Sequence, residues 1–369
     1  MPATSPGPRV LDLTVPQRAA RLEFDVSPAY ELIAVLQALS SPHEWRTYEQ
    51  GAGWFDELRS RMSDQLRSQL ELVSGEGCRA EWGHLAGLIA EAPDRSDLGK
   101  VIDHLAGLPA AAICRSLIES GLPGAARREH ADLIDAAAQG DKAARARLRE
   151  IVAKDGDEHD TRLADAILAI DSRDLRDRII DGLREAAGLL DEHLAEVMPA
   201  LRRDLELRRE RVRGLAIEDA VENATDGIHY ALEPGIRRVL IVPHAAMRPW
   251  VLISERLDTK IFMVAVSEAC LSADLDTPPA RLLQMFKALA EEQRLRILRR
   301  LAVDGPATLQ EIADHLGVAK STAHHHLVQL RAAGLTVVDL GAERDFRIRD
   351  GVGEDVRQLL ETYLRAGAK

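Results

Sequence analysis

Apolar side chains recur at helical spacing from about Ser27 to Glu218. The first helix of this segment has its inward positions at Tyr30, Ile33, Ala34, Gln37 and Ala38. Ser27 and Pro28 precede them as N-cap and first helical residue, because serine accepts a hydrogen bond from a free backbone N–H and proline has none to satisfy. Residues 1–18, which carry four prolines, are expected to form a flexible N-terminal arm.

Glycine and proline residues divide the remainder of this segment into helices of about 10–20 residues. The longest candidate runs from Asp160 to Arg213 and consists mostly of good helix formers. Pro199 lies inside it and is expected to break or kink the helix, because proline removes a backbone hydrogen bond and clashes with the preceding turn. Residues 19–235 are therefore expected to form a helical domain.

Near residue 236 the pattern changes to short runs rich in β-branched residues. Three such runs begin at Ile236, Arg248 and Lys260, and turns at 243–249 and 257–259 separate them. Consecutive short strands joined by turns are typical of an antiparallel meander. We therefore expect a three-stranded β-meander within residues 236–273, as part of the N-terminal domain.

A second change follows at residues 274–279 (DLDTPP), where paired prolines stop both helix and sheet and indicate a linker. Residues 280–369 then combine a helix over Leu282–Leu301, two short helices, two short strands and a last helix from Gly353 to Ala366. The predicted fold class is mainly α with small β elements. It comprises a helical N-terminal domain with its meander and a C-terminal winged helix-turn-helix.

The stretch 308–335 carries the most specific pattern. Thr308 and Glu311 have the spacing of a capping box, which satisfies the free N–H groups at a helix start. Gly317 lies where a tight turn needs a residue that tolerates positive φ. A second helix then covers 320–333, with inward positions at Ala323, Leu327 and Leu330. Two helices joined in this way form a helix-turn-helix, whose second helix enters the major groove of DNA.

The exposed part of that second helix carries the candidate DNA contacts. Their hydroxyl, imidazole, amide and ammonium groups suit base edges and phosphates, and they are Lys320, Ser321, Thr322, His324, His325 and Gln329. Arg344, Arg347 and Arg349 follow in a two-stranded hairpin, the wing, and are candidates for phosphate or minor-groove contacts; we predict the first two as DNA-binding residues. The alternative for these arginines is a solvated hairpin face.

These motifs resemble the winged-helix domain of ArsR-type bacterial transcription regulators. The resemblance rests on FKALAEEQRLRILRRL, on LQEIADHLGVAKSTAHHHLVQLRAAGL and on the hairpin after them, and it covers the last quarter of the chain. It implies a homodimer in which helices 282–301 and 354–364 pair across a two-fold axis. It further implies an inverted-repeat operator in double-stranded DNA, with half-sites about one helical turn apart, and repression as the expected effect.

The chain departs from the metal-sensing members of that family. Its helix before the turn begins TLQE (308–311) without cysteine, and its last helix has no histidine. His324, His325 and His326 are consecutive, so their side chains point about 100° apart and do not converge on one ion. We expect no metal and no cofactor, and assign His326 to a structural or phosphate contact.

Charge is divided unevenly along the chain. The whole chain has 48 Lys and Arg against 60 Asp and Glu, a net charge of -12, which argues against a non-specific nucleic-acid binder. Residues 1–276 hold 34 basic and 48 acidic residues, whereas residues 277–369 hold 14 and 12, a net charge of +2. DNA binding is thus expected to depend on base contacts and dimer spacing more than on general attraction.

Three further groups have a structural interpretation, which we favour, and a functional one. Residues 155–160 (DGDEHD) form a solvated loop or a cation site. A second group provides hydrogen-bonded interface residues or lines a pocket: His229, Tyr230 and His244. A third anchors the N-terminal core or forms a ligand wall: Trp45, Trp54 and Phe55.

Other sequence signals point to a cytoplasmic protein that is not an enzyme. The cysteines at positions 78, 114 and 270 are widely spaced, which fits a reducing compartment. No signal peptide is apparent, and the apolar runs are far shorter than the ~20 residues that span a bilayer, so no membrane association is expected. No P-loop, dinucleotide fingerprint, nucleophile elbow or zinc-protease motif is present.

The predicted function is a sequence-specific DNA-binding transcription regulator. Its N-terminal domain is expected to sense an unknown small-molecule effector or to bind a partner. The alternative is a protein-interaction module whose winged helix contacts protein instead of DNA. The two differ in salt dependence, because contacts to DNA phosphates weaken steeply as salt rises.

Overall fold

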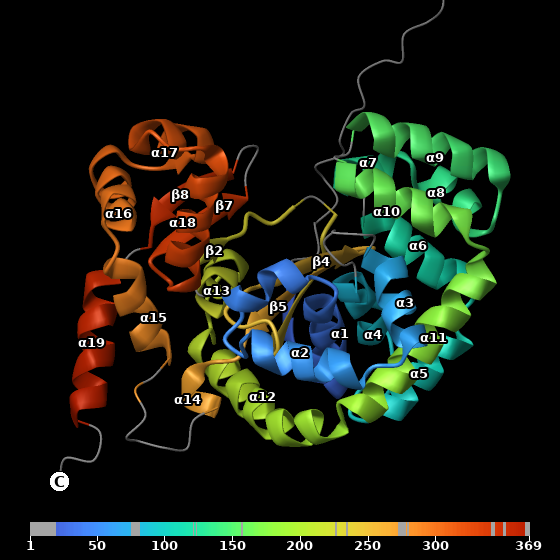
Figure 1. Ribbon diagram of the computed structural model, residues 1–369, viewed down its shortest axis with the longest axis horizontal. Helices are drawn as coiled ribbons and strands as arrows, with labels where there is room; N and C mark the ends of the chain where they lie inside the picture. The colour runs from blue at the N-terminus through green and yellow to red at the C-terminus, as the bar shows by residue number, and fades with distance from the viewer. Residues whose placement is uncertain are drawn as a thin grey trace, which may run out of the picture.

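Figure 1 shows the computed structural model of the chain, which has two lobes. The large lobe comprises the described residues of 20–271 and the small lobe those of 280–365. The structure describes residues 20–74, 82–120, 122, 124–155, 158–225, 227–233, 235–271, 278, 280–340, 344–349 and 352–365. The predicted arm lies outside the described residues, as do 272–277 and 279 of the linker region.

Helix α1 (Pro28–Leu39) lies at the centre of the large lobe. Every residue from Ala29 to Leu39 is buried, so the helix is surrounded by other elements on all sides. Ser27 caps it as predicted, and its hydroxyl oxygen accepts a hydrogen bond from the N–H of Ala29 at 3.1 Å. Pro28 occupies the first helical position.

A four-stranded mixed sheet packs beside α1. Its spatial order is β1 (Arg21–Phe24), β3 (Arg238–His244), β5 (Thr259–Ala265) and β4 (Leu252–Arg256). β3 pairs in parallel with both β1 and β5, while β4 pairs antiparallel with β5. The predicted antiparallel meander is therefore wrong, because β5 inserts between β3 and β4. The nearly continuous burial of β3 and β5 suits parallel strands that are covered on both faces.

The two faces of this sheet pack against different helices. Leu240, Val242, Ile261 and Met263 join the core around α1, whereas Val239, Ile241, Phe262 and Val264 pack with α13 (Ile217–Ala224). This alternation follows from the strand geometry, in which successive side chains point to opposite faces. Strand β1 lies within residues 19–235, the predicted helical domain, but before the helical pattern that begins near Ser27, and sequence reasoning did not predict this strand.

Helices surround the sheet and α1 (Figure 1). They are η1 (Pro42–Thr47), α2 (Ala52–Arg61), α3 (Asp64–Ser74), η2 (Trp82–Leu85), α4 (Ala86–Ala90), α5 (Leu98–Gly107), α6 (Ala110–Ser120), α7 (Gly124–Glu129), α8 (Ala131–Ala138), α9 (Lys142–Asp155), α10 (Glu158–Ala169), α11 (Ser172–Leu189), α12 (Asp191–Arg211) and α14 (Glu268–Leu271).

The longest predicted helix, from Asp160 to Arg213, is divided differently from the expectation. The helix is interrupted near Asp171, which caps α11 by accepting a hydrogen bond from the N–H of Arg173. It is interrupted a second time at Leu190, between α11 and α12. Helix α12 continues through Pro199. The neighbours of this proline, Val197, Met198, Ala200 and Leu201, are buried, so tertiary packing stabilises the helix across it.

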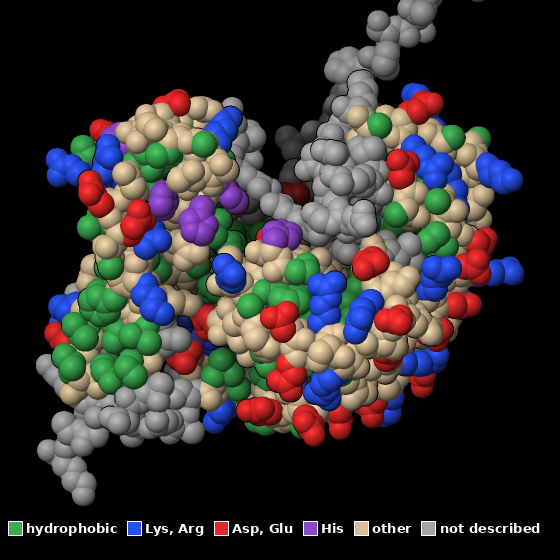
Figure 2. Space-filling view, in the orientation of Figure 1, with side chains coloured by type: hydrophobic (Ala, Val, Ile, Leu, Met, Phe, Trp, Pro, Cys, Tyr) green, Lys and Arg blue, Asp and Glu red, His purple; other side chains and the backbone are tan. Residues whose placement is uncertain are grey.

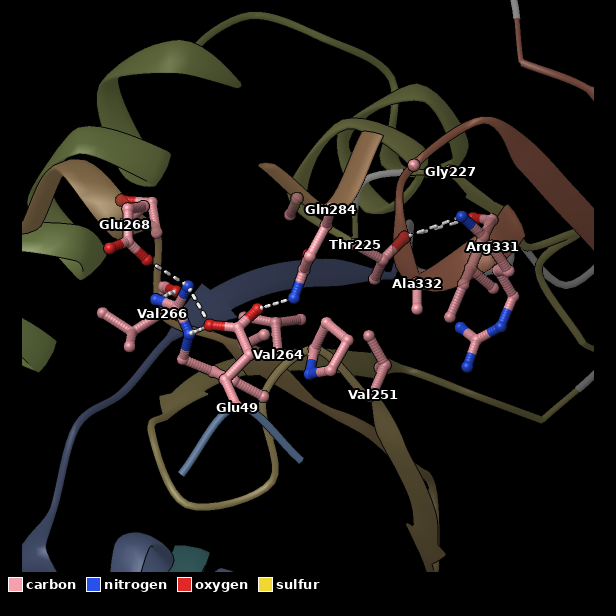
Figure 3. Close-up of a pocket in the computed structure, with 17 residues that line it drawn as sticks. Glu49, Thr225, Gly227, Val251, Val264, Val266, Glu268, Gln284, Arg331 and Ala332 are labelled. Atoms are coloured by element: carbon pink, nitrogen blue, oxygen red, sulfur yellow. Dashed lines mark hydrogen bonds and ion pairs between the residues drawn. The ribbon is translucent and has the colours of Figure 1, made fainter. Parts of the chain in front are cut away.

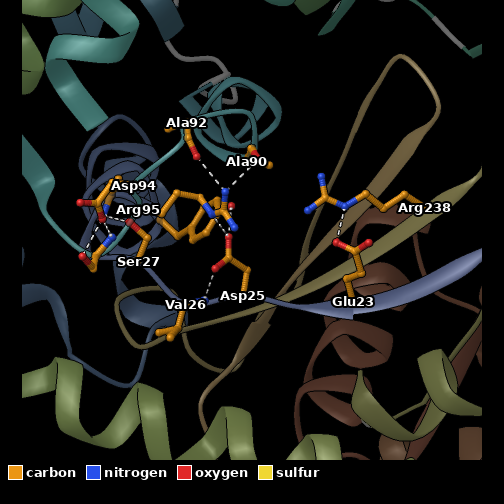
Figure 4. A network of polar contacts seen from close by, with 12 residues as sticks. Glu23, Asp25, Val26, Ser27, Ala90, Ala92, Asp94, Arg95 and Arg238 are labelled. Atoms are coloured by element: carbon orange, nitrogen blue, oxygen red, sulfur yellow. Dashed lines mark hydrogen bonds and ion pairs between the residues drawn. The ribbon is translucent and has the colours of Figure 1, made fainter. Parts of the chain in front are cut away.

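A polar network fixes β1 to the helices around it (Figure 4). Asp25 follows β1, forms an ion pair with Arg95 at 2.5 Å and accepts a hydrogen bond from the Tyr30 hydroxyl at 3.0 Å. Arg95 also donates to the carbonyl oxygens of Ala90 and Ala92, at the end of α4. These bonds hold β1 in place as an edge strand of the sheet.

The small lobe contains five helices among its described residues. They are α15 (Ala280–Leu289), α16 (Glu292–Asp304), α17 (Leu309–Leu316), α18 (Lys320–Ala332) and α19 (Val352–Arg365). The single helix predicted over Leu282–Leu301 is in fact α15 and α16, because the backbone of Glu291 is extended. The break lets Met285 on α15 and Ile297 on α16 reach one core from different directions.

A small sheet joins the two lobes. β7 (Thr336–Leu340) and β8 (Arg344–Ile348) pair antiparallel where two strands were predicted, and β6 (Ala307–Thr308) adds to β8. The other edge is β2 (Ile228–His229), which comes from the large lobe and pairs in parallel with β7. Sequence reasoning did not predict β2. The division into separate domains therefore stays a prediction.

Across the part of the chain that the structure describes, no single helix is long and apolar enough to cross a membrane. The bent pair Leu98–Gly107 and Ala110–Glu119 passes the test of length and composition only when both helices are taken together. Both helices bury their apolar faces in the core of the large lobe, through residues such as Val101 and Leu117.

Candidate nucleic-acid interface

The turn between α17 and α18 has the geometry that its sequence predicts. The Thr308 hydroxyl accepts a hydrogen bond from the N–H of Glu311, and the Glu311 carboxylate accepts one from the N–H of Thr308 at 2.8 Å. These hydrogen bonds lower the pKa of Glu311, since they favour the carboxylate form. Gly317 has a φ of 69°, which glycine adopts without strain. The chain can therefore reverse direction into α18.

Helix α18 is held by its predicted apolar face. Ala323, Leu327 and Leu330 are 0% exposed and pack with Ile312 and Leu316 of α17 in the core of the small lobe. The opposite side of α18 is left without cover from this core. That side is where a helix-turn-helix presents its second helix to a partner.

The predicted contact residues at the start of α18 are all on the surface. Lys320, Ser321, Thr322, His324 and His325 are exposed, and Gln329 is half-buried. Because successive helical residues turn by about 100°, Ser321 and His325 lie opposite the buried face, whereas His324 lies nearer Val328 and Arg331 on the adjoining side. We call Ser321, His325, Thr322 and Gln329 together the outer face of α18. His324, Val328 and Arg331 form its inner face.

His326 lies apart from the other two histidines of the HHH run. Its Nδ1 is 3.1 Å from a carboxylate oxygen of Glu291, between α15 and α16. This position suits the structural one of the two roles expected for His326, and a phosphate contact stays a prediction. Among the described residues, no cluster of three His, Cys, Asp or Glu side chains has the geometry to hold a metal ion.

The hairpin arginines have different surroundings. Arg347 forms an ion pair with Glu222 of α13 at 3.0 Å, and Arg349 donates to the carbonyl oxygen of Gly334 at 2.7 Å. The side chain of Arg344 lies outside the described residues. Contact between Arg347 and DNA stays a prediction, and in this arrangement it requires the ion pair to Glu222 to open.

Glu222 is also the partner of His229, so it links α13 to both strands at the junction. Its carboxylate lies 3.0 Å from His229 Nδ1. Burial favours the protonated carboxyl, but the hydrogen bonds from His229 and Arg347 outweigh it and lower the pKa of Glu222. Gly227 lies beside β7, and a Cβ there would come within 2.3 Å of Val337. The large lobe therefore approaches β7 closely.

A second polar contact joins the lobes below α18 (Figure 3). Arg248 forms ion pairs with Glu49 at 2.7 Å and with Glu268 at 2.6 Å. Gln284 of α15 donates a hydrogen bond to Glu49. The same part of the interface contains Arg331, whose guanidinium carbon lies 5.2 Å from the ring centroid of Trp250.

The inner face of α18 and the large lobe line an open cavity of about 430 Å³. Figure 2 shows histidine side chains gathered along the gap between the lobes. The residues that line the cavity come from Trp250 and strand β4 on one side and from the inner face of α18 on the other. Sequence reasoning did not single out Arg331, Trp250 or Ser254 as site residues. An arginine in the last turn of a helix is usual there, because it complements the helix dipole, so position alone does not distinguish it.

The remaining sequence candidates belong to the core of the large lobe or lie outside the described residues. His244 is 0% exposed with Nε2 3.0 Å from the carbonyl oxygen of Trp250, and burial lowers its pKa to about 4. Tyr230 packs edge-on against Phe262. Neither these residues nor His229 line the cavity. The side chains of the carboxylate cluster at 155–160 are not described.

The aromatic group near the N-terminus is part of the core, as favoured from the sequence. Phe55 is 0% exposed and Trp45 is 5% exposed, and their rings stack with centroids 5.5 Å apart. Trp54 is half-buried and packs edge-on against Phe55 at 4.9 Å. The Trp45 indole N–H donates to the carbonyl oxygen of Ala38 at the end of α1.

Comparison with known proteins identifies the class of the small lobe. Residues 289–339 match a family described as a helix-turn-helix domain, so this part of the chain is a helix-turn-helix domain. Over 54 residues the chain is 44% identical to YceK of Bacillus subtilis (strain 168), described as an uncharacterized HTH-type transcriptional regulator. The match covers 14% of this chain and 54% of that protein, so the chain spans about half the length of this curated relative. No solved structure matches.

Proposed function

We propose that this protein is a sequence-specific DNA-binding transcription regulator that acts in the cytoplasm and reads DNA through the outer face of α18. The observation that carries the proposal is the helix-turn-helix itself: a capped α17, a left-handed Gly317 and an α18 whose side away from the core is polar and exposed. The likeness to a helix-turn-helix transcriptional regulator supports it. Lys320, the first residue of α18, contacts a phosphate. Base edges are contacted by Ser321, Thr322, His325 and Gln329.

The wing has a supporting part in this proposal. Arg344 and Arg347 belong to β8, which pairs with β7, the strand that packs against α18, and basic side chains of such a hairpin reach phosphates or the minor groove. Arg347 makes this contact only when it leaves Glu222. His324 lies on the inner face, so it contacts DNA only at the border between the two faces.

The proposed assembly is a homodimer of the ArsR type formed through α15 and α19. Leu283 and Phe286 of α15 are 43% and 42% exposed, and Leu364 of α19 is 68% exposed. Figure 2 shows hydrophobic side chains gathered over the part of the small lobe that α15 and α19 form. An exposed apolar patch of this kind marks a protein-contact surface. A two-fold dimer would read an inverted repeat, with repression as its effect.

The oligomeric state tests the dimer. Size-exclusion chromatography with light scattering should give twice the chain mass for the wild type and a single chain mass for Leu283→Glu with Phe286→Glu. Val303→Glu is the matched control, because Val303 is also exposed but lies on α16. A wild type that is monomeric at micromolar concentration contradicts the dimer.

Selection of bound duplexes from a randomised pool, followed by titration of the enriched duplex, tests DNA binding. We expect affinity to fall steeply with salt, and Lys320→Ala to reduce the slope of log affinity against log salt by about 1. Lys142→Ala is the control, since Lys142 is an exposed lysine on α9 of the large lobe. No enrichment of any duplex at low salt would contradict the proposal and favour the protein-interaction alternative.

A further inference from the structure

Arg331 has an unusual environment for a surface-type residue. Its guanidinium carbon lies over the Trp250 ring, 5.2 Å from the ring centroid. Within the part of the chain that the structure describes, this guanidinium has no hydrogen-bond acceptor and no carboxylate partner. Burial lowers the pKa of Arg331, with no compensating negative charge nearby. The Arg331 side chain is only partly buried and lines a cavity, so an anion that enters this cavity can pair with the guanidinium.

Ser254 gives a second and independent observation in the same cavity. It lies on β4 and is 6% exposed, and its hydroxyl oxygen has no hydrogen-bond partner among the described residues. Buried hydroxyl groups in proteins are nearly always hydrogen-bonded. Ser254 and Arg331 both belong to the lining of the 430 Å³ cavity, one from the large lobe and the other from α18.

The rest of the lining is largely apolar. The apolar residues that line the cavity include Trp250, Met247, Leu252, Leu327, Val328 and Phe346. The one carboxylate among the described lining residues is Glu44, which accepts a hydrogen bond from the Tyr48 hydroxyl at 2.8 Å. Sites for small organic molecules have volumes of about 300–1,000 Å³ and combine apolar walls with a few polar groups, as this cavity does.

The chemistry of the two polar groups defines the ligand. The indole ring lies beside the guanidinium of Arg331 and offers it no hydrogen-bond acceptor, so the guanidinium N–H groups are left to donate. Such a planar fork matches a carboxylate, which accepts two parallel hydrogen bonds. We infer that the cavity between Trp250 and the inner face of α18 binds a small organic acid. The carboxylate of this acid pairs with Arg331, its apolar body packs on the Trp250 side of the cavity, and a polar substituent reaches Ser254.

The consequence for regulation rests on the proposed function. An acid held between Arg331 and the large lobe stabilises the arrangement in which α18 is applied to Trp250 and Arg347 is paired with Glu222. The other arrangement is the one in which Arg347 has left Glu222 and can contact DNA. A ligand that binds the paired arrangement more tightly lowers DNA affinity, by the difference between the ligand's binding free energies for the two arrangements. The effector would thus release the operator.

Calorimetric titration of the full chain tests the site without DNA. The probes are benzoate and hexanoate, with benzyl alcohol as the uncharged equivalent of benzoate and inorganic phosphate as an anion without an apolar body. We expect at least one carboxylate to bind with one site per chain, and benzyl alcohol and phosphate to bind at least tenfold more weakly. Failure of both carboxylates to bind up to about 10 mM would overturn the inference.

Substitutions locate the site. Arg331→Gln should weaken carboxylate binding at least tenfold, Ser254→Ala a few-fold, and Arg331→Lys by an intermediate factor, because lysine keeps the charge but loses the fork. Arg299→Gln on α16, an exposed arginine, is the control and should bind as the wild type does. Equal affinity of Arg331→Gln and the wild type overturns the inference. Should Arg331→Gln fail to fold, Arg331→Lys and Ser254→Ala decide the question in the same way.

The DNA arm separates this inference from the proposed function. With the selected duplex bound, the binding carboxylate should raise the apparent dissociation constant in the wild type but not in Arg331→Gln. Binding of carboxylates by a chain that binds no duplex would leave the site standing and remove the regulator. Binding of a duplex by a chain that binds no carboxylate would leave the proposed regulator standing and remove the carboxylate site.

Discussion

The interior of the large lobe and the outer face of α18 hold polar side chains in opposite environments. The large lobe buries them: Glu31 is 0% exposed and accepts hydrogen bonds from the N–H groups of Ala245 and Ala246, and His244 is 0% exposed beside the Trp250 carbonyl. The small lobe exposes them along α18, where Ser321 and His325 face outward. Buried polar groups fix a structure, because leaving them unpaired is costly. Exposed ones are available to a partner.

This difference assigns a consequence to each substitution. Changes at buried polar residues of the large lobe should alter its stability, whereas changes on the outer face of α18 should alter DNA binding alone. The cavity is the place where the two kinds of environment meet, because Ser254 comes from the large lobe and Arg331 from α18. The following predictions run from the largest expected effect to the smallest.

The stability of the large lobe should fall as pH falls from 7 to 5. His244 has a folded-state pKa of about 4 against 6.5 when unfolded, so below pH 6.5 the unfolded chain takes up a proton that the folded chain does not. The expected loss is about 2 kcal/mol, measured by urea unfolding at the two pH values. His244→Gln should remove most of this dependence, and exposed His325→Gln should leave it unchanged. The same pH dependence in His244→Gln would contradict the assignment.

DNA affinity should fall about tenfold in His325→Ala, which corresponds to about 1.4 kcal/mol for one lost base contact. The unfolding midpoint should not change, because His325 is exposed. Titration of the selected duplex by fluorescence anisotropy measures the first quantity and thermal unfolding the second. A stability loss comparable to the affinity loss would mean that His325 is structural, and the contrast between the lobes would fail.

Glu222→Gln should raise DNA affinity about threefold, since it removes the ion pair between Glu222 and Arg347 and so lowers the cost of turning Arg347 toward a phosphate. Glu206→Gln is the matched control, because Glu206 pairs with Arg209 on the surface of α12. The same anisotropy titration compares both variants with the wild type. Unchanged affinity in Glu222→Gln would show that the contact between α13 and β8 does not restrain the hairpin.

Arg331→Met should leave the ligand-free protein as stable as the wild type or more stable by up to about 0.5 kcal/mol. The substitution removes a partly buried charge that has no anionic partner among the described residues, and methionine retains contact with Trp250. Urea unfolding at pH 7 measures the effect. A clear destabilisation would assign Arg331 to the structure of the interface instead of to a ligand.

Sequence reasoning succeeded where structure depends on neighbours in the chain. The Thr308 and Glu311 capping box, the turn at Gly317 and the Ser27 cap of α1 involve residues at most three apart, or a single backbone conformation. The apolar face of α18 was equally predictable from its spacing.

It failed where distant segments decide the structure. Strand β1 pairs in parallel with β3 through residues more than 200 positions apart, such as Arg21 and Arg238. Strand β3 pairs in parallel with β5 instead of with β4, the next strand along the chain. The break before α16 depends on a core that α15 and α16 share. The cavity residues were missed for the same reason, since Arg331 meets Trp250 only when the lobes come together.

The central claim is that α18 has one face for DNA and another for the large lobe. Its most direct test is the affinity for the selected duplex, measured in the absence of organic acids, of two double variants: Ser321→Ala with His325→Ala on the outer face, and Val328→Ala with Arg331→Gln on the inner face. We predict a loss of at least tenfold for the outer pair and no loss for the inner pair. Equal losses in both pairs, or none in the outer pair, would contradict the claim.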